Sequence, residues 1–494
     1  MSLEKKQSDE IIQVEHLENV QDVQYDPEFE RKTIRQIDRR MLPLLGPLLG
    51  LLYSVALADR DAFTLGLLYS VALADRSNLS IARTAGMEED LQIEIGNRYS
   101  VVSCLYFVPY ILLQLPSNAV LRYFGVRYCM TVYVIGWGIA QLGMAFVKTW
   151  EQLLVCRVLL GAFEAGFFPA MTFVITTWYK RHEMQTRLAF FYLSAILIAG
   201  FAPILSYVIS LLKGKGGLNG WNWIFLIEGL LTIILGIIAY FYIVDFPDRN
   251  TFLTPEQTKF VLTRVQQDRG DALADTITAQ KVFKHLGDWL IWAYSVMFMA
   301  GAMVSYAIAF FNTTILRSMG YSVAASILLT TPPFLASVIS AFILSRLSDR
   351  MKHRAGFIAF QAMITIAGLA CMAYAKQNGV RYFGIFLAYM GASGVIPGSL
   401  AYAANNVVSH SKRSVSTALI VIWGGIGGIL GTTVFRQQDA PRYINGIWAT
   451  IGAQLLVLVL LMCTTITLRM RNKRSREGKM KEPLEGQPGF YYTL

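Results

Sequence analysis

The segment Trp223-Ile-Phe-Leu-Ile-Glu-Gly-Leu-Leu-Thr-Ile-Ile-Leu-Gly-Ile-Ile-Ala-Tyr-Phe-Tyr-Ile243 contains a single charged residue, Glu228. A helix rises about 1.5 Å per residue, so a stretch of this length spans the roughly 30 Å hydrocarbon core of a bilayer. Apolar stretches of similar length recur along the chain. Only helices and closed barrels satisfy their backbone inside a bilayer, and these stretches are too continuous for barrel strands. The sequence therefore predicts an all-α polytopic membrane protein.

The composition supports the same conclusion. Of the 494 residues, 54% are hydrophobic and 16% are charged, whereas a soluble domain carries about 25% charge. The five cysteines lie in or beside apolar stretches, which favours small packing residues over disulfides or metal ligands. The five histidines are scattered, and the sequence contains no paired-acid metal motif and no nucleophile elbow. We therefore expect no metal, no cofactor and no enzymatic activity.

The apolar stretches predict twelve transmembrane helices in two groups of six. The predicted spans are 62–82, 98–116, 128–147, 152–178, 187–212 and 222–243, then 286–311, 322–346, 355–375, 382–402, 414–435 and 444–468. The chain accordingly divides into an N-terminal tail (1–40), an extra apolar segment (41–61), a first six-helix half (62–243), a central loop (244–285), a second half (286–468) and a C-terminal tail (469–494). Two matched halves are typical of secondary transporters.

Lysine and arginine are concentrated in alternate loops, which sets the predicted orientation. The loop after the eighth span, for example, carries Arg346, Arg350, Lys352 and Arg354. Basic residues in short loops remain on the cytoplasmic side. Both termini and the central loop are therefore predicted to be cytoplasmic. This distribution accounts for the net charge of +11 without a nucleic-acid partner.

One short segment is duplicated. The eleven residues from Gly50 to Arg60 recur verbatim from Gly66 to Arg76, and only the second copy continues into Ser77-Asn78. Such an exact repeat suggests a recent insertion or an error in the gene sequence. We expect the first copy to lie along the inner membrane surface or to extend the first helix; a spanning hairpin is the alternative.

Five ionisable residues stand out inside the predicted spans of the first half, away from the span ends. They are Asp75, Arg76, Arg157, Glu164 and Glu228. A charge in hydrocarbon costs about 2.5–3.5 kcal/mol on insertion scales, so each is a candidate for function. Arg157 and Glu164 are seven residues apart and share one helix face, whereas Asp75 and Arg76 point about 100° apart. An arginine can hold a carboxylate in its planar fork, and a neighbouring carboxyl group can carry a proton.

Other interpretations of the polar residues remain open. Arg157 and Glu164 are also consistent with a structural pair that locks helices together. Glu228 is consistent with a capping or pairing role near the cytoplasmic half of its span. Asn405 and Asn406 fit packing or gating as well as substrate binding, and the intramembrane tyrosines Tyr106, Tyr110 and Tyr306 fit packing.

Several motifs resemble the major facilitator superfamily. The loop Ser345-Arg-Leu-Ser-Asp-Arg-Met-Lys-His-Arg354 resembles the gating motif of that family, and Leu121-Arg-Tyr-Phe-Gly-Val-Arg127 keeps its glycine and arginines. More specific strings resemble the fungal allantoate permease group of anion:cation symporters. These strings are Ala74-Asp-Arg-Ser-Asn78, Arg157-Val-Leu-Leu-Gly-Ala-Phe-Glu-Ala-Gly-Phe-Phe-Pro169, Trp178-Tyr-Lys-Arg, Gly220-Trp-Asn-Trp-Ile-Phe-Leu-Ile-Glu-Gly229, Gly320-Tyr-Ser, Asn405-Asn406 with Lys412-Arg413, and Asp439-Ala-Pro-Arg-Tyr443.

The resemblance implies a carrier of a small organic anion, such as allantoate, nicotinate, pantothenate or biotin, coupled to a proton. It implies a monomer in the plasma membrane, with the lipid bilayer as its surroundings. A uniporter or exchanger of the same fold, or a transporter-like nutrient sensor, is the alternative. The implied substrate residues are Arg76, Arg157, Asn78 and Asn405; the implied proton carriers are Asp75 and Glu164; the implied gating residues are Gly125, Arg127, Asp349, Arg350 and Arg354.

Overall fold

The computed structural model describes residues 28–30, 32–33, 61–179, 195, 198–243, 245–247, 253–269, 279–351, 353–407, 410–439, 442–479, 483–486 and 490–493. Within these residues every regular element is a helix. The first copy of the duplicated segment and the predicted surface segment around it lie outside the described residues. The second copy belongs to the first long helix, α4 (Asp61–Ala82), close to the predicted span 62–82.

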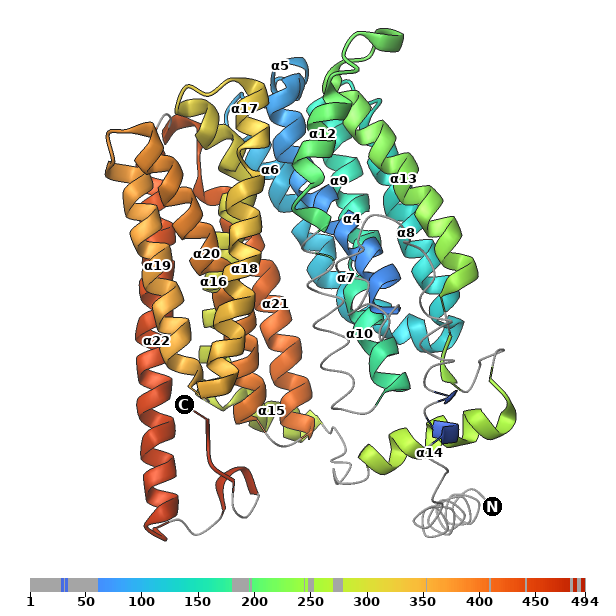
Figure 1. Ribbon diagram of the computed structural model, residues 1–494, viewed down its shortest axis with the longest axis vertical. Helices are drawn as coiled ribbons and strands as arrows, with labels where there is room; N and C mark the ends of the chain where they lie inside the picture. Colours follow the sequence, from blue (N-terminus) through green and yellow to red (C-terminus); the bar gives the residue numbers. More distant parts are fainter. Residues whose placement is uncertain are drawn as a thin grey trace.

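The helices form two bundles that stand side by side, on the right and the left of Figure 1. The first bundle contains α4, α6 (Arg98–Leu105), α7 (Phe107–Phe124), α8 (Val126–Met144), α9 (Trp150–Glu164), α10 (Phe167–Trp178), α12 (Ala202–Ser210) and α13 (Gly220–Tyr242). The second bundle contains α16 (Trp289–Ser318), α17 (Val323–Leu328), α18 (Thr331–Met351), α19 (Arg354–Tyr374), α20 (Asn378–Asn406), α21 (His410–Val434) and α22 (Ile444–Arg476). Two helices of the central loop, α14 (Pro255–Arg269) and α15 (Ala279–Leu286), lie at the lower end.

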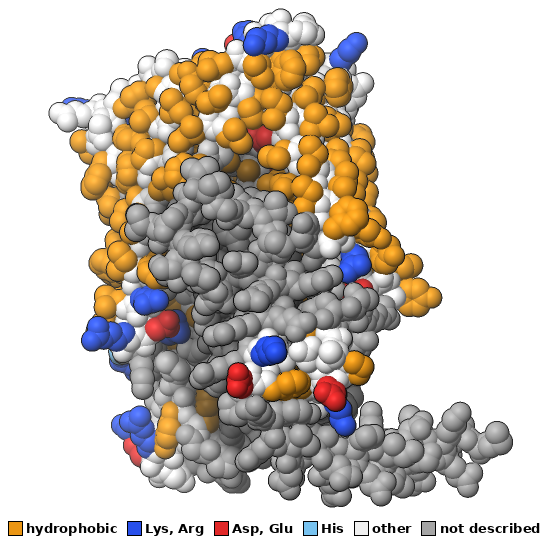
Figure 2. All heavy atoms as spheres, turned by 45° about the vertical axis from the view of Figure 1, so that its right-hand side comes forward, with side chains coloured by type: hydrophobic (Ala, Val, Ile, Leu, Met, Phe, Trp, Pro, Cys, Tyr) orange, Lys and Arg blue, Asp and Glu red, His pale blue; other side chains and the backbone are white. Residues whose placement is uncertain are grey.

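The length and composition of the helices match a membrane-spanning fold. Within the described part of the chain, eight helices are long and apolar enough to cross a membrane. The other predicted spans correspond to α4, to α6 with α7, to α8 and, for the span 187–212, to α12; residues 187–194 and 196–197 of that span lie outside the described residues. Hydrophobic side chains cover most of the upper half of the face in Figure 2. Many large apolar side chains of the described residues are exposed, among them Leu112 and Phe241. The predicted fold class, twelve helices in two halves, is confirmed.

Hydrogen bonds join the two bundles in their upper half. Ser80 Oγ on α4 lies 2.7 Å from Thr313 Oγ1 on α16, and the Tyr99 hydroxyl donates to the Phe310 carbonyl oxygen at 3.0 Å. The described contacts thus fasten the bundles at the end opposite to α14 and α15.

Candidate functional site

A buried ion pair lies at the junction of the two bundles. Arg76 on α4 donates from Nε to Glu164 Oε1 on α9 at 2.7 Å, and its Nη2 lies 2.5 Å from the same oxygen. The two residues are only 8% and 3% exposed. Both residues were candidates from the sequence. Their pairing, however, joins two helices through residues that are 88 positions apart in the chain.

Three tyrosines surround this pair. The Tyr106 hydroxyl donates to Glu164 Oε2 at 2.6 Å, and Arg76 Nη1 donates to the Tyr306 hydroxyl at 3.1 Å. The guanidinium carbon of Arg76 lies 5.7 Å and 5.0 Å from the ring centres of Tyr106 and Tyr110, within the range of a cation–π interaction. Because Tyr306 belongs to α16, the site is built by both bundles. From the sequence, packing was the favoured role for these tyrosines. The four-residue spacing of Tyr106 and Tyr110 puts them on one helix face and could have indicated a shared site.

Gly161 allows the close approach that this site requires. It lies on α9, and a Cβ atom there would overlap the backbone carbonyl oxygen of Tyr106. With only hydrogen at this position, α9 packs directly against the start of α7. Tyr106 can therefore reach Glu164, which lies one turn further along α9.

Asp75 points away from Arg76, as the helical step of about 100° predicts. Its carboxylate accepts hydrogen bonds from Trp137 Nε1 at 3.0 Å and from Gln141 Nε2 at 3.2 Å, both on α8. The residue is 1% exposed. Asp75 therefore ties α4 to α8, one helix step away from the central ion pair.

Arg157 is a buried arginine on α9. It is 1% exposed, and its Nε and Nη2 atoms have no hydrogen-bond partner among the described residues. It lies about 10 Å from Glu164 along α9, at a rise of about 1.5 Å per residue. An uncompensated buried charge is costly, so an arginine in this state is suited to receive an anionic group.

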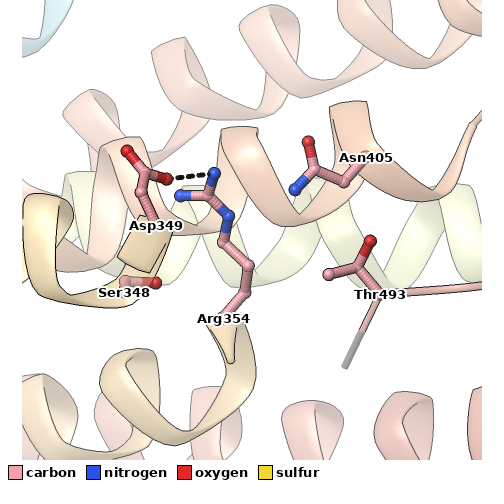
Figure 3. A pocket seen from close by; sticks show the side chains of 5 residues that line it. All are labelled: Ser348, Asp349, Arg354, Asn405 and Thr493. Carbon is pink, nitrogen blue, oxygen red and sulfur yellow. Dashed lines mark ion pairs between the residues drawn. The ribbon is translucent and has the colours of Figure 1, made fainter. Parts of the chain in front are cut away.

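The structure places the two predicted asparagine ligands elsewhere. Asn78 is fully buried and its amide bonds Glu228 on α13, on the side of α4 that faces α12 and α13. Asn405 lies at the lower end of α20. There it lines a pocket of about 370 Å³ with Ser348, Asp349, Arg354 and Thr493 (Figure 3). Neither asparagine contacts the Arg76–Glu164 pair.

The predicted gating residues form two turns at the lower end of the bundles. Gly125 joins α7 to α8 at φ +88°, a conformation that favours glycine, and a Cβ there would lie 2.7 Å from Asp245 Oδ2. The adjacent Arg127 donates from Nε to the Ile243 carbonyl oxygen at 3.2 Å.

The second turn lies between α18 and α19. There Asp349 and Arg354 form an ion pair of 2.5 Å, drawn as the dashed line in Figure 3. Arg350, between them in sequence, is exposed at the end of α18. The two turns occupy corresponding places in the two bundles, as the matched loops of the sequence predict.

The chain is similar to known proteins of one family. The model of the Major Facilitator Superfamily matches residues 65–432. The Major facilitator-type transporter hxnP of Emericella nidulans is 29% identical over 476 residues, covering 94% of this chain and 91% of that protein. The High-affinity nicotinic acid transporter of Saccharomyces cerevisiae is 25% identical over 449 residues, covering 90% and 79%.

Solved structures show the same fold. A bacterial homologue of the human lysosomal transporter Spinster, in an inward-facing and unoccupied conformation, matches with a TM-score of 0.62 at 15% identity, covering 81% of this chain and 94% of that one. The xylose transporter XylE from E. coli, in a partially occluded inward open conformation, matches with a TM-score of 0.62 at 12% identity, covering 81% and 97%. At these identities the likeness concerns the fold.

Proposed function

Because the chain belongs to the Major Facilitator Superfamily, we propose that it imports a small organic anion together with a proton by alternating access. The relatives are named as transporters and not as enzymes, so transport itself is the activity. The proposal concerns the substrate and the coupling: a carboxylate such as a vitamin, allantoate or a related metabolite, and a proton. The observation that carries it is the buried pair of Arg76 and Glu164 between the two bundles.

The pair links anion binding to protonation by competition. Glu164 occupies the Nε and Nη2 side of the Arg76 guanidinium, the side that a substrate carboxylate would need for a two-point contact. When Glu164 takes up a proton it loses its negative charge, and its attraction for Arg76 falls. The guanidinium is then available to the substrate. By linkage, the bound anion also favours protonation of Glu164.

The site also fits a switch between two conformations. Tyr306 reaches Arg76 from the opposite bundle, so a ligand that takes over Arg76 changes a contact between the bundles. The bonds of Ser80 and Tyr99 hold the upper end together in this structure. We assign the upper end to the outside and the lower end to the cytoplasm of the plasma membrane, on the basic loops described above. We therefore propose that this structure, joined at its upper end, is the inward-facing conformation of a carrier that functions as a monomer.

The aromatic surroundings favour a carboxylate with a flat or apolar body. The rings of Tyr106, Tyr110 and Tyr306 flank Arg76, and the ring centres of Phe107 and Tyr306 are 5.0 Å apart. The yeast relative is named for nicotinic acid, an aromatic carboxylate. Nicotinate is therefore the first compound to test, with pantothenate, biotin and allantoate beside it.

Uptake of these radiolabelled anions, at several external pH values, tests the proposal. Cells expressing the chain should accumulate at least one of them, and more strongly as the outside becomes acidic. Arg76→Ala should abolish this uptake while the protein remains at the cell surface. Uptake of a cation or of a neutral sugar instead, or wild-type uptake by Arg76→Ala, would contradict the anion site.

A further inference from the structure

Glu228 is a buried acid that the proposed mechanism does not use. It is the single charged residue of α13 and is 5% exposed. Its two carboxyl oxygens contact the amide nitrogen of Asn78 on α4 and the hydroxyl of Ser206 on α12, the latter at 2.8 Å. Asn78 and Ser206 are themselves fully buried, and no cationic side chain pairs with Glu228 among the described residues.

Counting protons in this cluster indicates the charge of Glu228. The Ser206 oxygen lies 2.8 Å from Glu228 Oε1, 3.0 Å from the Ala202 carbonyl oxygen on its own helix and 3.2 Å from Asn78 Oδ1, but a serine hydroxyl has only one proton to donate. If Glu228 carries a proton, its hydroxyl donates to Ser206 and Ser206 donates to Asn78. The Asn78 amide donates back to the second carboxyl oxygen. The ring of three hydrogen bonds then closes, with one donor and one acceptor in each bond.

The ionised alternative satisfies the cluster less well. The single proton of Ser206 would go to Glu228, and the Asn78 carbonyl oxygen would lose its donor from Ser206. A full negative charge would also remain in an apolar environment without a cation, which is costly. The neutral ring needs neither of these penalties.

We propose that Glu228 is a further proton-binding site of this carrier, neutral when it closes a hydrogen-bond ring with Asn78 and Ser206 across α4, α12 and α13. The ring holds α12 against α4, so release of the proton would loosen a contact within the first bundle. The inference rests on the proposed proton-coupled transport for its role in the cycle.

The groups around Glu228 are consistent with this role. On α4, Asp75 is close enough to interact with Glu228 electrostatically, while Arg76 is engaged by Glu164. On α8, Gln141 is turned toward Asp75. At the upper end Arg83 pairs with Glu88. The cations Arg76 and Arg83 are thus each engaged by an acid other than Glu228.

Infrared spectroscopy of the purified protein in lipid at neutral pH reads the proton directly, because a protonated carboxyl has its own carbonyl band. We expect such a band in the wild type, its loss in Glu228→Gln, and its retention in the matched control Glu164→Gln. If Glu228→Gln does not reach the membrane, Ser206→Ala provides the test. Loss of the hydrogen bond between residue 206 and Glu228 should shift the carbonyl band of Glu228. A band that Glu228→Gln leaves in place, or that Ser206→Ala leaves unshifted, overturns the assignment.

Uptake against external pH tests the role in transport. Wild-type uptake should decline on the alkaline side by up to about tenfold per pH unit for each titrating group that must be protonated. The glutamine in Glu228→Gln is neutral at every pH. The slope of the decline in this variant should therefore be smaller by the contribution of one titrating group. A wild-type pH profile in this variant overturns the role in transport. The infrared result is independent of the proposed function, so the two proposals can fail separately.

Discussion

Replacing Arg76 with lysine separates charge from geometry at the central site. The guanidinium reaches Glu164 through two nitrogens, at 2.7 Å and 2.5 Å, and Tyr306 through a third at 3.1 Å. Lysine keeps the positive charge but presents a single compact ammonium group in place of the planar fork. A substrate carboxylate held at two points by arginine would be held at one point by lysine.

The expected loss is that of one charge-assisted hydrogen bond, about 1.5–3 kcal/mol. At 1.4 kcal/mol per tenfold, this corresponds to a roughly 10- to 150-fold weaker apparent affinity. The assay is the concentration dependence of uptake for whichever carboxylate the wild type carries, corrected for protein at the cell surface. Arg98→Lys is the matched control, because Arg98 bonds a backbone carbonyl at the protein surface. Equal affinities in wild type and Arg76→Lys would refute the two-point contact.

Three further variants test the surrounding structure. Gly161→Val places side-chain atoms where the backbone carbonyl oxygen preceding α7 lies, so we expect a lower Tm and little protein at the cell surface; normal Tm and transport would contradict the close packing. Lys412 contacts Asp288 and Glu485, each at 2.8 Å; burial lowers the pKa of Lys412, but the hydrogen bonds and negative charges of the two acids together outweigh burial, so its net pKa lies above the usual value. A raised pKa means that the contribution of Lys412 to docking of the C-terminal tail persists at neutral pH and is lost only as pH rises through that pKa. Lys412→Ala should therefore make the tail sensitive to protease at neutral pH, and equal cleavage of wild type and variant would count against the docked tail. Deletion of residues 51–66 leaves one copy of the repeat and should give equal or better expression and transport; loss of transport with normal surface expression would show that the repeat is needed.

The fold followed from the sequence because a membrane imposes a simple requirement on length and polarity. Each long apolar stretch had to be a helix, and the duplicated segment contributed its second copy to α4. The helical step also predicted that Asp75 and Arg76 would face different neighbours, as they do. These inferences depend on the local spacing of residues along a helix, which can be read directly from the sequence.

The partners across the bundle could not be predicted in the same way. Glu164 bonds Arg76, and Tyr306 reaches that arginine across 230 positions of the chain. Such pairings depend on how helices rotate and pack, which one sequence does not determine. Glu228 is the clearest case, since its ring with Asn78 depends on the relative positions of three helices. Arg157 and Glu164 share a helix face and were also consistent with a structural pair, yet the structure leaves the Nε and Nη2 atoms of Arg157 without a partner among the described residues.

Glu164→Gln tests the central claim most directly, with accumulation and exchange measured on the same membranes. The amide is close in size to the acid and cannot release a proton. We predict that accumulation driven by a pH gradient disappears, while exchange of labelled for unlabelled substrate remains measurable. Accumulation against a gradient that stays at the wild-type level in Glu164→Gln would contradict the coupling of the anion to a proton at this site.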